Sequence, residues 1–415
     1  MRVASRPWIP PGGLIAGHIA HALMWVMLAG LTVTDWTGPT LHGLAWIHLA
    51  ALAWLTLTAL TVLVYVMPAF TEVDLRHERA ARVALALFGI GAFGMVASFW
   101  SQHPGALSWS AALVLAGLIV YLLAVLPMLS AATRGPRTEA SIARAFLIVF
   151  SFLIAAAVLG LGMALALASH AAPGWLVTTP AVHAHVAGIG WLTVLVMGVS
   201  VRTSGPIFGA RPSVLWHHIT AALAITVGIF ALVFGLWFSL GVLVWVGAIL
   251  VAAALALYMV DVVDLASHAK VAHRPPQAFY LTSVLWLAVA VVLGLGVVGG
   301  APWKASYVFV ALVGWVGQMV LAHLHHVAIR MIATTFRGED DETPPSELLT
   351  APLSWVAYAS FQLAILLGAI GLGSGGAGMV HLAGILGLAG WVSMTANVAV
   401  AISRAGHPGG VTATP

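Results

Sequence analysis

Long apolar stretches alternate with short polar ones along the whole chain. Twelve of these stretches are long enough to cross a hydrocarbon core of about 30 Å. Only helices satisfy all their backbone hydrogen bonds in lipid at this length. The pattern therefore predicts an all-α, polytopic membrane protein whose spans cover residues 14–34, 43–68, 81–100, 107–130, 142–169, 177–200, 214–237, 240–262, 278–299, 305–333, 352–373 and 378–402.

The loops between the spans are short, which predicts one twelve-helix transmembrane domain over residues 1–403. The end of the chain, which closes in "GHPGGVTATP", has the composition of a disordered segment, so residues 404–415 are predicted to form a disordered cytoplasmic tail.

The composition agrees with a membrane protein, because 61% of the residues are hydrophobic and only 7% are charged. With the N-terminus in the cytoplasm, fifteen of the 16 Lys and Arg residues lie on the cytoplasmic side, and only Lys304 lies on the other. This asymmetry predicts cytoplasmic N- and C-termini. The basic residues are scattered over short loops, so the net charge of +4 indicates membrane topology and gives no sign of nucleic-acid binding.

The chain contains no cysteine. This excludes disulfides, thiolate catalysis, iron–sulfur clusters and covalently attached c-type haem. Any bound metal must be held by nitrogen, oxygen or thioether ligands, for which the sequence offers 18 His and 13 Met.

An internal repeat is visible around two of the histidines. "HLAALAWLTL" begins at His48 and "HVAGIGWLTV" begins at His185, an offset of 137 residues. A looser version, "HLAGILGLAGWV", begins at His381. The offset is close to one third of the chain, which predicts three four-helix units with spans 2, 6 and 10 in equivalent places.

Twelve histidines fall within the spans or at their edges, and the predicted topology divides them into two groups. The outer group is His42, His48, His183, His185 and His381, and the inner group is His18, His21, His217, His218, His323, His325 and His326.

A single imidazole within a span is more often a hydrogen-bonded helix contact than a ligand. Several at one level are harder to explain in this way, because each needs polar partners that lipid cannot supply. The span interiors hold almost no carboxylates to pair with them. Imidazole suits iron, copper and zinc, and two imidazoles on facing helices can ligate a haem. The histidines therefore predict a bound metal or haem.

Two motifs carry a resemblance to known families. "HAHVAGIGW" resembles the H-x-H-x-x-G/A-x-x-G-W stretch of the catalytic subunit of cbb3-type haem–copper oxidases, whose two histidines ligate haems. The run from His185 to "GARP" at 209–212 is more similar to the NnrS family of twelve-span haem- and copper-containing proteins linked to nitric oxide. That family also has an H-x-H-E motif followed by a proline, and His48 and Pro68 have the same separation. Trp46 and Leu49 depart from the motif, and the histidine of the family's Gly-His-Thr-Gly-Arg turn is missing here.

The resemblance implies a multi-pass protein of the bacterial inner membrane that binds haem b, with copper as a second candidate cofactor. It implies His48 and His185 as the first haem ligands, with His183, His381 and His42 after them. His323, His325, His326, His217 and His218 are candidates for a second haem or a copper ion, and His18 and His21 belong to the same inner group.

Three functions are consistent with these observations. The first is an oxidoreductase that acts on nitric oxide or a related small gas, with quinol or another outside electron donor. The second is an electron-relay subunit whose haems each have two histidine ligands. The third is a transporter of haem or copper.

Overall fold

The computed structural model describes residues 11–31, 35, 40–170, 174, 178–210, 215–270, 275–338 and 344–406, with only the backbone described at 215–219 and 345. In these ranges twelve helices are long and apolar enough to cross a membrane, which confirms the predicted fold class. Nine are single elements: α1 (Pro11–Gly30), α5 (Glu78–Trp100), α6 (Pro104–Ala132), α7 (Arg137–Ala168), α10 (Leu215–Trp237), α11 (Gly241–Ser267), α12 (Pro275–Val298), α16 (Ala351–Ser374) and α17 (Ala377–Gly406).

The other three spans each change helix type in the middle. Span 2 joins α3 (Leu41–His48), η1 (Leu49–Thr56) and α4 (Leu57–Thr71). Span 6 joins α8 (Thr179–His185), η3 (Val186–Thr193) and α9 (Val194–Phe208), and span 10 joins α13 (Lys304–Phe309), η4 (Val310–Gly317) and α14 (Gln318–Arg337). Each η segment is an eight-residue π-helix.

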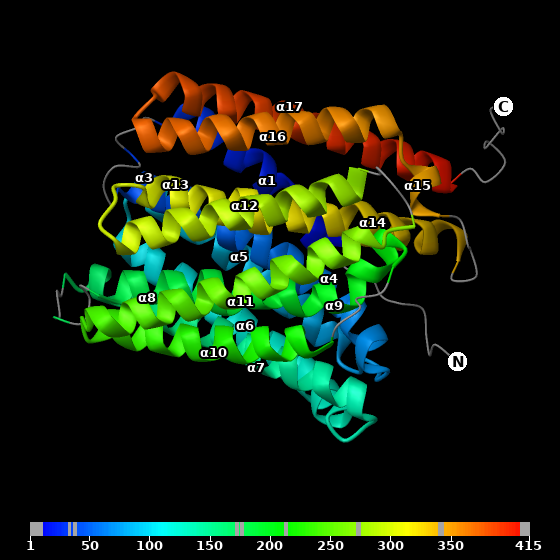
Figure 1. The fold of residues 1–415 in the computed structure, drawn as a ribbon, viewed down its shortest axis with the longest axis horizontal. Helices are drawn as coiled ribbons and strands as arrows, with labels where there is room; N and C mark the ends of the chain where they lie inside the picture. Colours follow the sequence, from blue (N-terminus) through cyan, green and yellow to red (C-terminus); the bar gives the residue numbers. More distant parts are fainter. Residues whose placement is uncertain are drawn as a thin grey trace.

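The helices run side by side along the length of the molecule, as Figure 1 shows. α3, α8 and α13 begin at one end of the bundle, here called the α8 end. The short helix α15 (Pro345–Leu348) lies at the opposite end, here called the α15 end. The helix α17 continues to Gly406, so residues 404–406 of the predicted tail are helical, and the rest of that prediction, residues 407–415, lies outside the described ranges.

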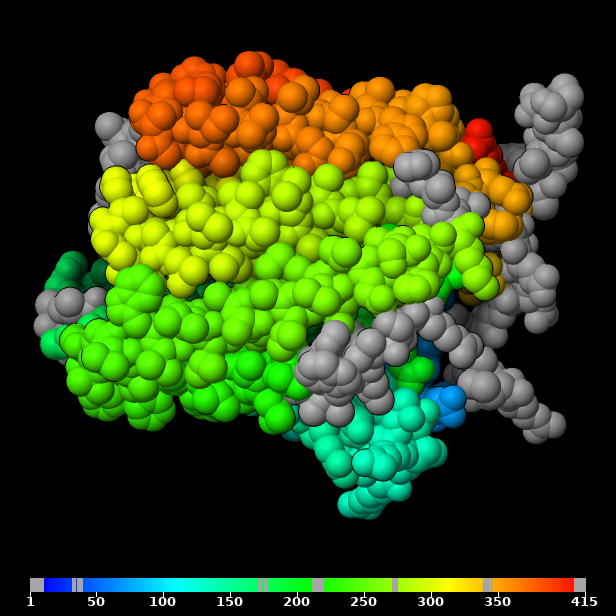
Figure 2. Space-filling view, in the orientation of Figure 1, coloured from blue at the N-terminus to red at the C-terminus, as the bar shows by residue number. Residues whose placement is uncertain are grey.

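Spans 2, 6 and 10 occupy the middle of the bundle. η4 contacts both η1 and η3, while α1, α7 and α12 pack on spans 2, 6 and 10, respectively. The remaining spans form the hairpins α5–α6, α10–α11 and α16–α17. Figure 2 shows the face formed by α10, α11, α12 and α16, and these helices expose large apolar side chains such as Val242, Leu285 and Leu363. Such a surface suits contact with lipid tails.

The offset of 137 residues holds beyond the two histidine motifs. α4 and α9 have equal lengths and begin and end 137 residues apart. Left-handed backbone recurs at Glu72 and Gly209, and again at Gln102 and Ser239. The third unit follows at a different offset, because α14 begins 124 residues after α9. The backbone thus agrees with three equivalent units, and the third copy of the motif lies at Phe309–Gly317 in span 10, whereas "HLAGILGLAGWV" forms part of the regular helix α17.

Close helix contacts hold the hairpins together. A Cβ atom added at Gly247 in α11 would clash with the backbone nitrogen of Leu232 in α10. Only glycine permits such an approach, which is typical of helix packing in membranes.

We expect Gly247→Ala to destabilise the protein by about 1–3 kcal/mol, because the α10 and α11 backbones would have to move apart. Gly241→Ala is the matched control on the same helix, since nothing lies within 4 Å of a Cβ atom added there. Unfolding of the purified protein in detergent measures both. Equal stability of the two variants would contradict this packing.

Candidate metal centre

A layer of tryptophans and threonines joins the three π-helices in the middle of the bundle. Trp54, Trp191 and Trp315 occupy equivalent positions and are at most 2% exposed. The Trp191 Nε1–H donates to Thr56 Oγ1 over 3.0 Å, and the Trp315 Nε1–H donates to Thr193 Oγ1 over 3.2 Å. A hydrogen bond thus joins the second unit to the first, and another joins the third unit to the second. π-Helical segments of this kind are frequent at functional sites.

The third junction of this layer is different, because Gly317 stands where the other units have threonine. A Cβ atom at Gly317 would lie 2.7 Å from Trp54 Cη2, so the Trp54 ring fills that space. The Trp54 ring also stacks on the His21 imidazole, with ring centres 4.0 Å apart and an interplanar angle of 4°. The three units therefore differ at one junction in this layer.

A second layer of rings lies toward the α8 end. It contains the residues six and eight positions before each tryptophan, which are Trp46 and His48, His183 and His185, and Tyr307 and Phe309. Trp46 of the first unit faces Phe309 of the third, with ring centres 5.8 Å apart. At the equivalent junction between the first and second units, His48 faces His183, with ring centres 6.4 Å apart and an interplanar angle of 19°.

Both imidazoles of this pair are held by backbone carbonyls. His48 Nδ1 lies 2.8 Å from the Leu44 oxygen, and His183 Nδ1 lies 3.0 Å from the Ala156 oxygen. A carbonyl only accepts, so each Nδ1 carries the proton and each Nε2 carries a lone pair. The described residues make no hydrogen bond to either Nε2. A metal-binding histidine has this arrangement, in which the second nitrogen fixes the tautomer.

The ring-centre distance of the pair, 6.4 Å, is close to that of two imidazoles that share one metal ion. Imidazole nitrogen binds metals at about 2.0–2.1 Å, which puts the centres of two opposed rings about 6 Å apart. Phe99 packs on His48 with ring centres 4.8 Å apart, and Gly160 backs His183, where an added Cβ atom would lie 3.3 Å from Cε1. The two imidazoles could hold a copper ion or a haem iron, since both metals take imidazole nitrogen.

The other outer histidines are not part of this pair. His185, two residues from His183, has Nδ1 2.7 Å from the Ala181 oxygen and interacts electrostatically with Lys304. His381 Nε2 lies 3.2 Å from the Leu31 oxygen. The structure thus pairs His48 with His183, where the sequence had favoured His185.

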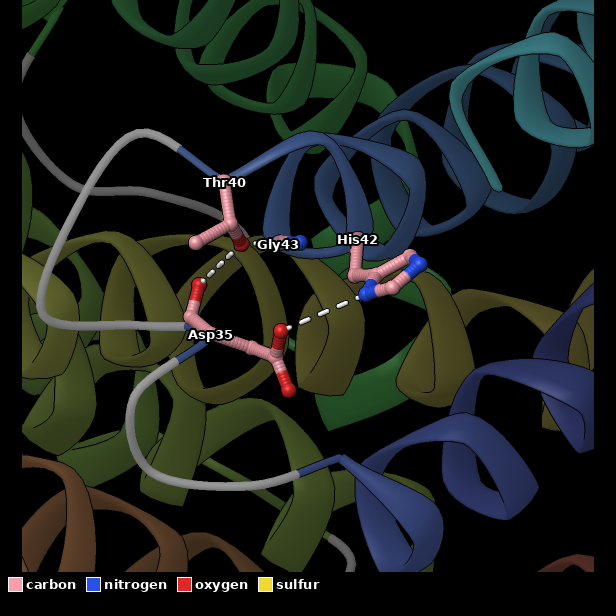
Figure 3. A network of polar contacts seen from close by, with 4 residues as sticks. All are labelled: Asp35, Thr40, His42 and Gly43. Carbon is pink, nitrogen blue, oxygen red and sulfur yellow. Dashed lines mark hydrogen bonds and ion pairs between the residues drawn. The ribbon is translucent and has the colours of Figure 1, made fainter. Parts of the chain in front are cut away.

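Figure 3 shows the surroundings of His42 at the start of α3. Its Nδ1 lies 3.4 Å from Asp35 Oδ1. The Thr40 hydroxyl donates to the Asp35 carbonyl and accepts from the Gly43 N–H, which caps the helix. His42 thus serves to join the preceding segment to α3.

The histidines of α1 are engaged by aromatic and hydroxyl groups. His18 Nε2 lies 2.7 Å from Thr395 Oγ1, and its ring stacks on Trp391. His21 is 1% exposed and its Nε2 accepts the Trp25 Nε1–H. In neither residue is Nε2 left for a metal.

The α14 histidines point to separate partners. His323 Nδ1 lies 2.8 Å from the Met319 oxygen and its Nε2 lies 2.6 Å from Thr203 Oγ1. His325 Nδ1 lies 2.8 Å from the Leu321 oxygen, and its ring stacks on Phe279. His326 follows one turn after His323 and interacts electrostatically with Arg330. The side chains of His217 and His218 lie outside the described residues.

Across the described ranges no three His, Asp or Glu side chains lie close enough together to hold a metal ion. The two-imidazole pair of His48 and His183 is therefore the arrangement of described residues best suited to a metal. Neither a protein-family model nor a curated protein matches the chain.

Proposed function

We propose that this protein is a membrane-embedded metalloprotein that binds copper or haem b through His48 and His183 and acts on nitric oxide or a related small gas. The observation that carries this proposal is the pairing of two imidazoles with matched tautomers at a junction between units. At the equivalent junction Trp46 and Phe309 fill the space. Packing alone therefore has no need of imidazoles there.

The surroundings favour a small uncharged substrate. The pair is half-buried among the apolar side chains of a membrane bundle, which admit NO or O₂ and exclude ions. Copper or iron would supply one-electron chemistry there, with electrons from quinol or another outside donor. The protein's own residues hold the two Nε2 lone pairs in place through the Leu44 and Ala156 carbonyls.

Electron relay is a second candidate, which the pair would serve if both imidazoles held one haem. His48 and His183 would together hold one haem iron, and a haem held by two imidazoles would supply electron transfer without binding a gas. The two candidates differ in whether the metal keeps an open position.

Elemental analysis and reduced-minus-oxidised absorption spectra of protein expressed with haem and copper test the proposal. We expect close to one copper or haem iron per chain. A change in the absorption spectrum on adding NO supports the gas-reactive function. A six-coordinate haem whose absorption spectrum does not change on adding NO or CO supports electron relay. Purified protein free of both metals would contradict the proposal.

A further inference from the structure

A group of polar side chains lies inside the α15 half of the bundle, at the junction of the second and third units. Tyr258 of α11 donates its hydroxyl to Ser200 Oγ of α9 over 3.1 Å. The Tyr258 and Tyr280 hydroxyls are 3.1 Å apart, and the Ser204 side chain lies close to the Tyr280 hydroxyl. All four residues are buried. Buried hydroxyls in this number are unusual inside a membrane and call for an explanation.

The group has an acid at one end and an imidazole at the other. Asp261 lies one helical turn after Tyr258, is 7% exposed and interacts with it electrostatically. Near the other end, the Tyr280 ring lies 5.8 Å from the His323 ring, and Thr203 bonds His323 Nε2. Ser200, Thr203 and Ser204 share one face of α9.

The repeat shows that the fold does not require these polar residues. In the first unit the positions of Ser200, Thr203 and Ser204 hold Leu63, Val66 and Met67, and the position of Asp261 holds Ala124. In the third unit the three α9 positions hold Leu324, Val327 and Ala328. The equivalent helices of the first and third units thus pack with apolar side chains at these positions. The polar residues of α9 therefore serve a purpose other than packing.

One tyrosine is common to the first two units and provides an internal comparison. Tyr121 is the equivalent of Tyr258 and is equally enclosed, at 1% exposure against 4%. Its hydroxyl donates to the Leu60 backbone carbonyl over 2.9 Å. A carbonyl cannot pass a proton on, and the Ser200 hydroxyl beside Tyr258 also donates to one, the Val196 carbonyl, over 2.6 Å. The Tyr280 hydroxyl, 3.1 Å from that of Tyr258, can both donate and accept, so it offers a route that Tyr121 lacks.

We infer that Asp261, Tyr258, Tyr280 and Ser204 form a proton path from the α15 end toward His323 in the interior of the bundle. In each step one O–H bond breaks as the next forms, so a proton entering at Asp261 replaces the one passed on toward Tyr280. His326 and Arg330 lie on the turns of α14 that follow His323. The inference is independent of the metal proposed at His48 and His183.

Exchange of tyrosine hydroxyl protons with D₂O tests the path. The chain has six tyrosines, so protein labelled with ¹³C at the ring carbon that bears the hydroxyl gives few NMR signals, which single Tyr→Phe variants assign. We expect the Tyr258 and Tyr280 hydroxyls of metal-free protein to exchange at least about tenfold faster than that of Tyr121, since local access sets such rates.

Removing the carboxylate of Asp261 should slow hydroxyl exchange only at the tyrosines of the path. We expect Asp261→Asn to slow exchange at Tyr258 and Tyr280 and to leave Tyr121 unchanged, and Ser204→Ala to do the same if the first variant does not fold. The inference is overturned if Tyr258 exchanges as slowly as Tyr121, or if neither variant slows it.

Discussion

The double variant His48→Phe/His183→Trp is expected to fold normally and to lose its bound metal. These substitutions recreate, between the first and second units, the Phe309–Trp46 pair of the equivalent junction. The space is therefore filled with rings that the bundle already accepts, while both Nε2 lone pairs disappear. Since even residues that support a ligand change metal affinity by about 10–100-fold, losing both ligands should leave no stoichiometric metal. Elemental analysis of the purified variant measures the loss.

His381→Ala is the control for this variant, because His381 lies on α17 and contacts the Leu31 carbonyl instead of the pair. Its metal content should equal that of the unchanged protein. Full metal content in the double variant would show that the metal is held elsewhere.

Replacement of Trp191 by alanine is expected to give the largest loss of stability, about 3–5 kcal/mol, because a fully buried tryptophan leaves a cavity that its surroundings cannot fill. Trp191 also fastens the second unit to the first through its bond to Thr56, and its ring stacks on Phe150. Unfolding in detergent, followed by tryptophan fluorescence or circular dichroism, measures the change.

Trp191→Phe separates the ring from its hydrogen bond. It keeps most of the buried area and removes one donor, so we expect a loss of about 1 kcal/mol. If both variants were as stable as the unchanged protein, the tryptophan layer would not hold the units together.

Hydropathy predicted the twelve helices because each span is an unbroken apolar run between polar loops. Span 10 is longer than expected, Lys304–Arg337 against 305–333, since α14 continues as a helix through the polar residues Thr334 and Thr335 to Arg337. The π-helices could not be predicted, because a change from i→i+4 to i→i+5 bonding leaves hydropathy unchanged. The third copy of the motif was missed since only Trp315 remains of the His-Trp-Leu-Thr pattern.

The candidate site was predicted in part. His48 and His183 were both named from the sequence, but His185 was expected to be the partner of His48. Residues two apart on a helix point in nearly opposite directions, so only one of His183 and His185 can face His48. Sequence alone could not tell which one, because that depends on how span 6 is rotated about its axis. The polar path was missed, although Ser200, Ser204 and Asp261 stand out as polar residues in apolar spans.

The most direct measurement is the position of the metal itself. Anomalous scattering from crystals of metal-loaded protein, collected at the copper and iron edges, locates it without reference to any variant. We expect one peak between His48 and His183, within bonding distance of both Nε2 atoms. A metal peak elsewhere in the bundle, with no peak between these two rings, would contradict this expectation.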